Sequence, residues 1–305
     1  MRNWKYLLTS QLVRGQWFMD PHVAQSSLVE VARLITPQQE LTVIQDKIYS
    51  ETNPFNISAA TFDDNNISDG FDQLPPDSIA IIKVTGTLLK YGTWCSYGTE
   101  EISEQMIYAA NHKNISGLLF IGDSGGGGVN SVAPMRKGFQ EFKNYGKPTL
   151  ALMDMAYSAM YYSICACDHI MAANDISSGF GSNGVMLSWI DVSQYMESIG
   201  VKQINLYPDE SSEKNLAFEL ALKGNYDMIK NEELSPLARK FQNTVIQDRG
   251  LKLKHLDDPR IIKGKTYSAE ESIANGLADS IGDRDKALET LRDLIEVKKF
   301  LNSNN

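Results

Sequence analysis

Short apolar runs alternate along the chain with segments in which apolar residues recur at helical spacing. Buried β-strands are predicted at five runs, residues 79–86, 115–122, 149–153, 170–173 and 204–207. Between them, helices are predicted at residues 102–114, 131–145 and 191–199. The order strand, helix, strand implies parallel pairing through right-handed crossovers. The pattern therefore predicts an α/β protein built on a parallel sheet.

The pattern is different before residue 79. Residues 20–46 show a roughly helical period that Pro37 interrupts, so residues 1–49 are predicted to form a helical N-terminal appendage. Residues 50–78 are rich in Asn, Asp, Ser and Pro and are predicted to be a linker or a mobile loop. The compact domain is expected over residues 79–290, followed by the end of a helix and a tail over residues 291–305.

Composition and charge narrow the class of protein. The 305 residues are 42% apolar and 22% charged, which is typical of a soluble globular protein. The net charge of −9, with no Lys/Arg cluster in the sequence, argues against a nucleic-acid-binding surface. The opening apolar stretch is too short for a signal peptide or a membrane anchor, and acidic residues interrupt the apolar region around residues 149–173. We therefore expect a cytoplasmic protein without a membrane anchor.

The cysteines are Cys95, Cys165 and Cys167. An odd number with Cys-x-Cys spacing fits neither a zinc site nor a redox pair. We interpret them as reduced residues of the core. No metal and no cofactor is predicted.

Ser158 stands where an apolar run gives way, through a tight turn, to a predicted helix. A serine at the start of a helix has unpaired backbone N–H groups and the positive end of the helix dipole beside it. That arrangement stabilises an oxyanion on an attacked carbonyl, so it suits acyl transfer. A serine that opens a helix is also a common N-cap, and the segment alone leaves both interpretations open.

Four consecutive glycines, residues 125–128, follow the predicted strand at residues 115–122. Glycines inside a regular element are destabilising, so these must lie where the backbone approaches something closely or adopts a positive φ. We interpret them as a loop whose N–H groups face a substrate carbonyl. A phosphate-binding loop would need a G-K-[ST] ending that this segment lacks, and a flexible turn is the other alternative. This loop, Ser158 and a loop at residues 179–184 all follow parallel strands, and ligands bind at that edge of open α/β sheets.

The Gly loop, the Ser158 segment and the loop at residues 179–184, in this order along the chain, resemble motifs of the signal peptide peptidase A (SppA) and phage protein C family of serine peptidases. That family has the ClpP/crotonase-type fold of repeated β-β-α units. The family patterns D-S-P-G-G, A-S-G-G-Y-Y and G-S-I-G-V read here as D-S-G-G-G from Asp123, A-Y-S-A-M-Y-Y from Ala156 and G-S-N-G-V from Gly181. Residues 264–279 resemble the family's late G-x-x-Y segment, and the similarity covers about residues 79–290. The departures are Gly125 for a proline, Ala159 and Met160 for glycines, and Asn183 for an isoleucine.

The resemblance implies a Ser/Lys dyad. Ser158 would be the nucleophile, Lys214 the general base and Ser182 a hydroxyl that orients the lysine amine. The N–H groups of Gly126 and Ala159 would be the oxyanion donors. Gly125 and Gly127 would bind substrate beside them. An extended peptide is expected to add to the Gly loop as a β-strand.

Other residues fit these roles less well. Lys202, the runner-up base, precedes a predicted strand, and Lys223 comes too late in the chain. His169 is the one histidine beside these loops, and we interpret it as a strand-edge residue, which disfavours a Ser-His-Asp triad. We interpret Ser124 and Ser163 as loop and helix packing residues.

The N-terminal residues resemble one branch of that family. Residues 5–10 and 17–21 look like the start of phage-type members, which open with a tryptophan-containing strand and helix. This resemblance implies a capsid-maturation protease that cleaves scaffold, portal or coat proteins in the host cytoplasm or within an assembling procapsid, and that forms a ring-shaped homo-oligomer. Two alternatives stay open. One is a catalytically decayed binding or assembly module, and the other is a crotonase-like acyl-CoA enzyme, which needs a CoA-adenine pocket and acidic residues.

Overall fold

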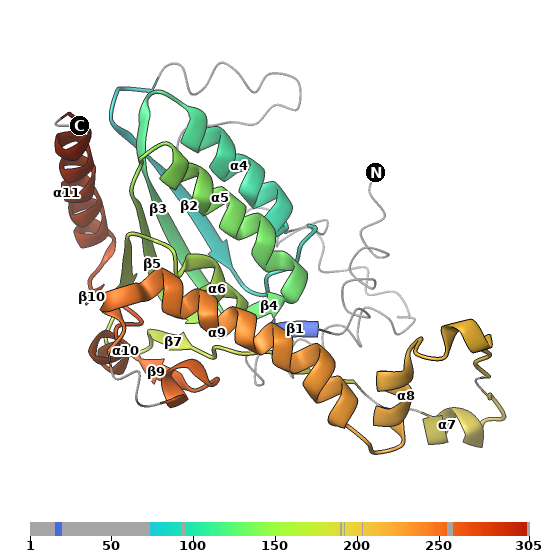
Figure 1. Cartoon of the computed structure of the whole chain (residues 1–305). Coiled ribbons are helices and arrows are strands. Elements are labelled where there is room, and N and C mark those ends of the chain that lie inside the picture. The colour runs from blue at the N-terminus through green and yellow to red at the C-terminus, as the bar shows by residue number, and fades with distance from the viewer. Residues whose placement is uncertain are drawn as a thin grey trace, which may run out of the picture.

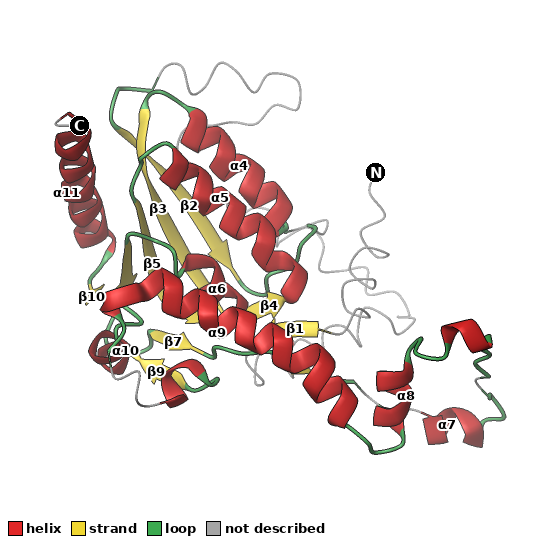
Figure 2. Ribbon diagram, viewed as in Figure 1, coloured by secondary structure: helices red, strands yellow, loops and turns green. Residues whose placement is uncertain are grey.

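A parallel sheet forms the centre of the computed structural model (Figure 1, Figure 2). Neighbouring strands pair in parallel in the order β10 (Ser280–Ile281), β6 (His169–Ala172), β5 (Thr149–Tyr157), β3 (Ile115–Ser124) and β2 (Ser78–Thr85). The far end of β5 pairs with β7 (Gly179–Gly181), which pairs antiparallel with β9 (Thr266–Ser268). The structure describes residues 16–19, 74–92, 96–189, 191, 193–202, 204–254 and 259–303. The predicted α/β class with a parallel sheet is confirmed.

Helices cover both faces of the sheet, which explains why its strands read as continuous apolar runs. α4 (Thr99–Asn111) and α5 (Val132–Asn144) lie on one face (Figure 1), where Leu118 and Phe120 of β3 join the main core. α11 (Arg284–Ser303) lies on the other face, where its Leu291 belongs to a second core with Leu119 and Leu150. Among the described residues, no helix has the length and apolar character needed to cross a membrane.

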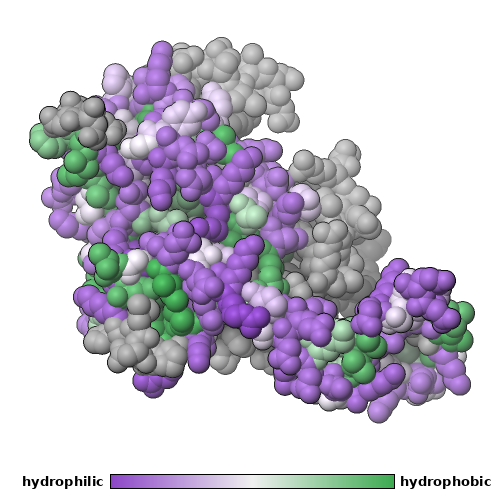
Figure 3. Space-filling model, in the orientation of Figure 1, coloured by the Kyte–Doolittle hydropathy of each residue, from purple (hydrophilic) through white to green (hydrophobic). Residues whose placement is uncertain are grey.

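A projecting arm, residues 188–234, leaves the body of the molecule after β8 (Met186–Leu187). It carries α7 (Ser193–Ser198), a 3₁₀ turn (Asp209–Ser211), α8 (Leu216–Leu222) and a π-helical turn (Ile229–Leu234), and α9 (Ser235–Arg249) then returns toward the sheet (Figure 1). A small core of its own holds the base of the arm together, with the rings of Trp189 and Phe218 5.6 Å apart. Apolar patches interrupt the polar surface of the arm (Figure 3).

One predicted strand is wrong. Residues 204–207 lie on the arm and form no strand, and the side chains of Ile204 and Leu206 are 78% and 90% exposed. The apolar alternation that suggested a strand is present, but no strand of the described chain lies beside it to complete a ladder. The other four predicted strands correspond to β2, β3, β5 and β6.

A separate small sheet joins the N-terminal segment to the body. β1 (Gln16–Met19) pairs antiparallel with β4 (Gly126–Gly128) on one side and with β8 on the other. The rest of the predicted helical appendage, and residues 50–73 of the predicted linker, lie outside the described residues. The remaining short elements are the 3₁₀ turns Val129–Ser131, Gly250–Lys252 and Pro259–Ile262, and α10 (Ala269–Asn275).

Candidate active site

Ser158 occupies the turn between β5 and α6 (Ala159–Ile164) with a strained backbone. Its φ of 52° and ψ of −116° lie where residues other than glycine are rarely found. Its N–H donates to the carbonyl of Gly181 at 2.9 Å, and its Oγ donates to the carbonyl of Gly184 at 3.4 Å. The residue is 1% exposed. A strained strand-to-helix turn of this kind presents the nucleophilic serine of α/β-hydrolases.

Packing of α6 holds this turn in place. Ala159 and Met160, which replace glycines of the family pattern, are fully buried and contribute to the main core. The Tyr161 hydroxyl donates to the Leu277 carbonyl at 2.9 Å, and the ring of Tyr162 stacks on Phe241 at 4.3 Å. The larger residues after Ser158 therefore point into the core, and their backbone N–H groups at the first turn have no intrahelical partner.

The Gly loop forms a short strand, β4, held by Leu88. The Leu88 N–H donates to the Gly126 carbonyl at 2.9 Å, and the Gly128 N–H donates to the Leu88 carbonyl at 3.0 Å. Gly126 has a φ of 108°, and a Cβ at Gly127 would lie 2.0 Å from the Leu88 carbonyl oxygen. Both reasons given for these glycines, a positive φ and close approach of another backbone, are therefore present.

The N–H groups of β4 face alternate sides of the strand. The Gly126 N–H donates to Ser124 Oγ at 3.1 Å, and the Gly128 N–H faces Leu88. Backbone alternation then turns the Gly127 N–H toward the opposite side, where β1 lies. The sequence analysis assigned Gly127 to substrate binding beside the oxyanion donors. Its N–H faces β1, the strand that also lies against α6.

The loop that begins at Gly181 borders Ser158 on the other side. Ser182 has a φ of 55°, and its N–H donates to the Lys265 carbonyl at 3.0 Å. Asn183 is fully buried, and its Nδ2 donates to the Ile261 carbonyl at 3.0 Å, while its Oδ1 has no hydrogen-bond partner among the described residues. The fold therefore brings the Ser158 turn, β4 and this loop together at one end of the sheet, as the sequence predicted.

Lys214 lies elsewhere. It is exposed on the projecting arm, where its N–H donates to the Ser211 carbonyl at 3.0 Å just before α8. α8 stands well away from α6 in Figure 1, so a single chain does not bring Lys214 to Ser158. The alternative bases Lys202 and Lys223 are also exposed on the arm.

Lys265 is a lysine of the site that the sequence analysis missed. Its carbonyl binds the Ser182 N–H, and its ammonium lies 4.5 Å from the centre of the Tyr267 ring and 4.0 Å from Glu271 Oε1. Its place in the G-K-T-Y motif was visible, but the antiparallel pairing of β9 with β7 that puts it beside Ser182 was not.

Several other side chains have structural roles. His169 begins β6, its Nε2 lies 2.7 Å from Ser280 Oγ, and burial lowers its pKa, which agrees with a strand-edge residue. Ser163 Oγ donates to the Ala159 carbonyl at 2.7 Å within α6, as packing predicts. Cys165 and Cys167 are buried and unpaired, and burial raises the pKa of Cys167 to about 12. Cys95 lies outside the described residues.

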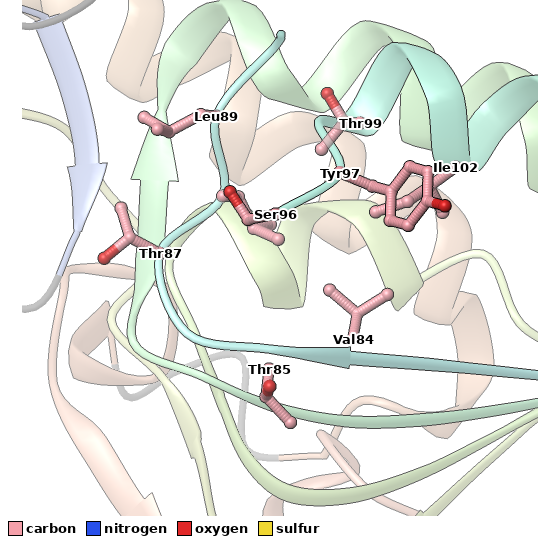
Figure 4. Close-up of a pocket in the computed structure, with 9 residues that line it drawn as sticks. Val84, Thr85, Thr87, Leu89, Ser96, Tyr97, Thr99 and Ile102 are labelled. Atoms are coloured by element: carbon pink, nitrogen blue, oxygen red, sulfur yellow. The ribbon is translucent and has the colours of Figure 1, made fainter. Parts of the chain in front are cut away.

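A small pocket lies between the end of β2 and the start of α4 (Figure 4), and Leu88 forms one of its walls. Its volume is about 60 Å³, and its walls include Val84, Leu88, Thr99 and Ile102. Thr99 is 1% exposed, and its hydroxyl has no hydrogen-bond partner in the part of the chain that the structure describes. Because the Leu88 backbone is bonded to β4, this pocket adjoins the Gly strand.

Comparisons with known proteins show what the chain is similar to. A family model described as "Peptidase family S49" matches residues 141–298. The "Putative signal peptide peptidase SppA" of Enterococcus faecium is 24% identical over 197 residues, and "Protease 4" of Salmonella typhi is 24% identical over 226 residues. These alignments cover 64% and 73% of this chain, but they span only 56% and 35% of those relatives.

Two solved structures align with most of the chain. A mutant of the 1510-N membrane-bound stomatin-specific protease is 14% identical, covering 71% of this chain and 85% of its own, with a TM-score of 0.44. An enoyl-CoA hydratase from Polaromonas sp. JS666 is 13% identical, covering 75% of this chain and 81% of its own, with a TM-score of 0.38.

Proposed function

The chain belongs to peptidase family S49, and on that basis we propose that it is a serine endopeptidase with Ser158 as its nucleophile. The observation that carries this proposal is the strained turn of Ser158, bonded to the loop at residues 181–184 and placed next to the Gly strand. Strain of this kind persists only where the surrounding structure imposes it, and it gathers at active sites.

The chemistry would follow from the groups around this turn. Ser158 Oγ attacks the substrate carbonyl, and a lysine amine takes its proton and later returns it to the leaving amine. The N–H groups of Ala159 and Gly127 would stabilise the oxyanion, with Gly127 in place of Gly126 because the Gly126 N–H already binds Ser124 Oγ. Water then hydrolyses the acyl-enzyme. Ser182 lies in the loop whose Gly181 and Gly184 carbonyls accept hydrogen bonds from Ser158, and its hydroxyl would orient the lysine amine.

We assign the base to Lys214 of a second copy. A lysine acts as a base only when it is neutral, and burial away from carboxylates favours that form. Lys214 is exposed on the arm just before α8, so contact with the site of a neighbouring chain would supply both its position and its burial. This arrangement requires the ring-shaped homo-oligomer that the resemblance implies. Lys265 of the same chain is the second candidate, because its backbone already binds Ser182.

The substrate would be an extended peptide. β1 pairs with β4 beside Ser158, and a peptide that takes the place of β1 would gain the same main-chain hydrogen bonds while its alternate side chains enter pockets. The pocket beside Leu88 has room for a small side chain, and the Thr99 hydroxyl would give it a polar contact. The phage-type resemblance of residues 5–21 supports scaffold, portal or coat proteins as natural substrates, in the host cytoplasm or a procapsid.

The two alternative functions, a decayed assembly module and an acyl-CoA enzyme, would need different residues around Ser158. A decayed assembly module would tolerate any small residue at position 158, and an acyl-CoA enzyme would bind CoA through an adenine pocket and use acidic groups. The strained Ser158 favours the peptidase over both, because strain without function is selected against by its cost in stability.

The test is cleavage of casein, or of a co-expressed scaffold protein, by the parent and by Ser158→Ala. We expect complete loss of cleavage with an unchanged fold, because a single hydroxyl is removed. Ser163→Ala is the matched control, since Ser163 is equally buried one turn along α6 and bonds only within the helix. Cleavage by Ser158→Ala at the parental rate would show that the nucleophile is another residue.

A further inference from the structure

The strand position beside Ser158 is already filled by the chain itself. β1 lies between β4 and β8 and pairs antiparallel with both, in the order β4-β1-β8. β4 and β8 do not pair with each other, so without β1 they would be two open edges separated by the width of one strand. This is the geometry that receives an extended peptide by β-strand addition.

The register of β1 places one end of it at the nucleophile. Met19 is paired with Gly126 of β4, and Trp17 is paired with Met186 of β8. Extending the second pairing by two residues sets Met19 level with Gly184, whose carbonyl accepts the hydrogen bond of Ser158 Oγ. The backbone of Met19 therefore passes between Gly126 and Gly184, the two neighbours of the Ser158 turn.

Two further observations agree with an occupied site. Phe18 is paired with Gly127, the glycine whose N–H faces this position. β1 also lies against α6, the helix that Ser158 begins, and Ser158 is only 1% exposed. A nucleophile for an added protein substrate has to be reachable, and here it is covered.

We propose that β1 is a built-in occupant of the substrate groove and that it holds the intact chain at low activity. This inference rests on the proposed peptidase function. A tethered strand competes at an effective concentration on the order of millimolar, so a free peptide binds only in the fraction of time that β1 is displaced. Displacement of residues 16–19, by a partner or by assembly, would then switch the enzyme on.

The experiment locks β1 in place with a disulfide. Trp17→Cys combined with Met186→Cys puts two cysteines directly opposite each other on antiparallel strands, a spacing that a disulfide can bridge. Trp17→Cys with Leu187→Cys is the matched control, because neighbouring residues of a strand point to opposite faces of the sheet. Both pairs are made in the full chain with Ser158→Ala, and the probe is a fluorescent synthetic peptide of residues 14–21, followed by anisotropy.

We expect the first pair to form an intrachain disulfide, seen by peptide mapping, and the control pair to form none. Oxidation should weaken binding of the probe by at least about tenfold, and reductant should restore it. Three results would each overturn the proposal. The first pair could fail to cross-link, or a mixture of isotopically labelled and unlabelled chains could show the disulfide only between different chains. The third such result is equal probe binding in both redox states.

Catalysis is measured separately, so the two ideas fail separately. In chains that keep Ser158, the reduced form should cleave casein and the oxidised form should not. A chain that cross-links and excludes the probe but never cleaves casein would retain β1 as the occupant of the groove and refute the peptidase. Equal cleavage in both redox states would refute the inhibition by β1.

Discussion

Two serines at the candidate active site hold backbone conformations that serine rarely adopts. Ser158 and Ser182 have φ values of 52° and 55°, and each such conformation costs about 1–3 kcal/mol. The N–H groups of both residues are bonded to neighbouring main chain, at Gly181 and Lys265, which holds them there. Ser158 could be singled out from the sequence because the residues around it resemble the nucleophile motif of a known family. Its φ could not, since it depends on bonds to a loop more than 20 residues away.

Substitutions of single lysines test which residue is the general base. Lys214→Ala and Lys214→Arg should both be inactive in casein cleavage, because an arginine side chain stays protonated and accepts no proton. Lys265→Ala should retain activity and serves as the comparison on the same fold. Activity in the Arg variant would show that another group is the base. Loss in Lys265→Ala with retention in Lys214→Ala would place the base within the same chain.

At the scale of elements, local pattern predicted what local forces determine. The strands β2, β3 and β5 and the helices α4 and α5 follow from apolar periodicity, because each buries its own apolar residues on the shared core. The pairing of β1 with β4 and β8 joins segments more than 100 residues apart, and no local signal encodes such a pairing. The exposed run at residues 204–207 shows the converse, an apolar alternation without a partner strand in the described chain.

The Gly strand gives a prediction about an element. Gly125→Pro restores the residue of the family pattern, and it should leave peptide cleavage unchanged or raise it by reducing the freedom of the loop. Gly125 is not among the residues with positive φ, whereas Gly126 is, so a positive φ obstructs proline at Gly126 and not at Gly125. Gly126→Pro is therefore the control and should be inactive, because proline cannot adopt a φ of 108°. A large loss in Gly125→Pro would mean that its N–H binds substrate.

At the scale of the whole molecule, the arm is the feature on which the proposed shared site depends. Its exposed apolar residues include Tyr195, Ile199, Ile204 and Leu206, and exposed apolar groups gathered on one projection mark an interaction surface. Contact of this arm with a neighbouring chain would bury those residues and carry Lys214 to another Ser158. Light scattering across a concentration series should then show a homo-oligomer, and a monomer at every concentration would contradict it.

Mixing two inactive variants tests the shared site. Ser158→Ala and Lys214→Ala should each be inactive alone, and an equimolar co-assembled mixture should recover about one quarter of the parental activity, the fraction of interfaces at which both wild-type residues meet. The controls are samples of each single variant, taken through the same co-assembly procedure at the same total concentration. No recovery, although mixed oligomers are shown to form, would place both residues of the dyad in one chain.

The central claim is that Ser158 is an activated nucleophile, and the most direct measurement maps the adduct of a fluorophosphonate probe by mass spectrometry. Ser163 in α6 and Ser124 at the end of β3 are both buried and act as internal references. The account predicts a single phosphonylated residue, Ser158, and no adduct on Ser158→Ala. An adduct on another serine, or none under conditions that label a known serine peptidase to completion, would contradict it.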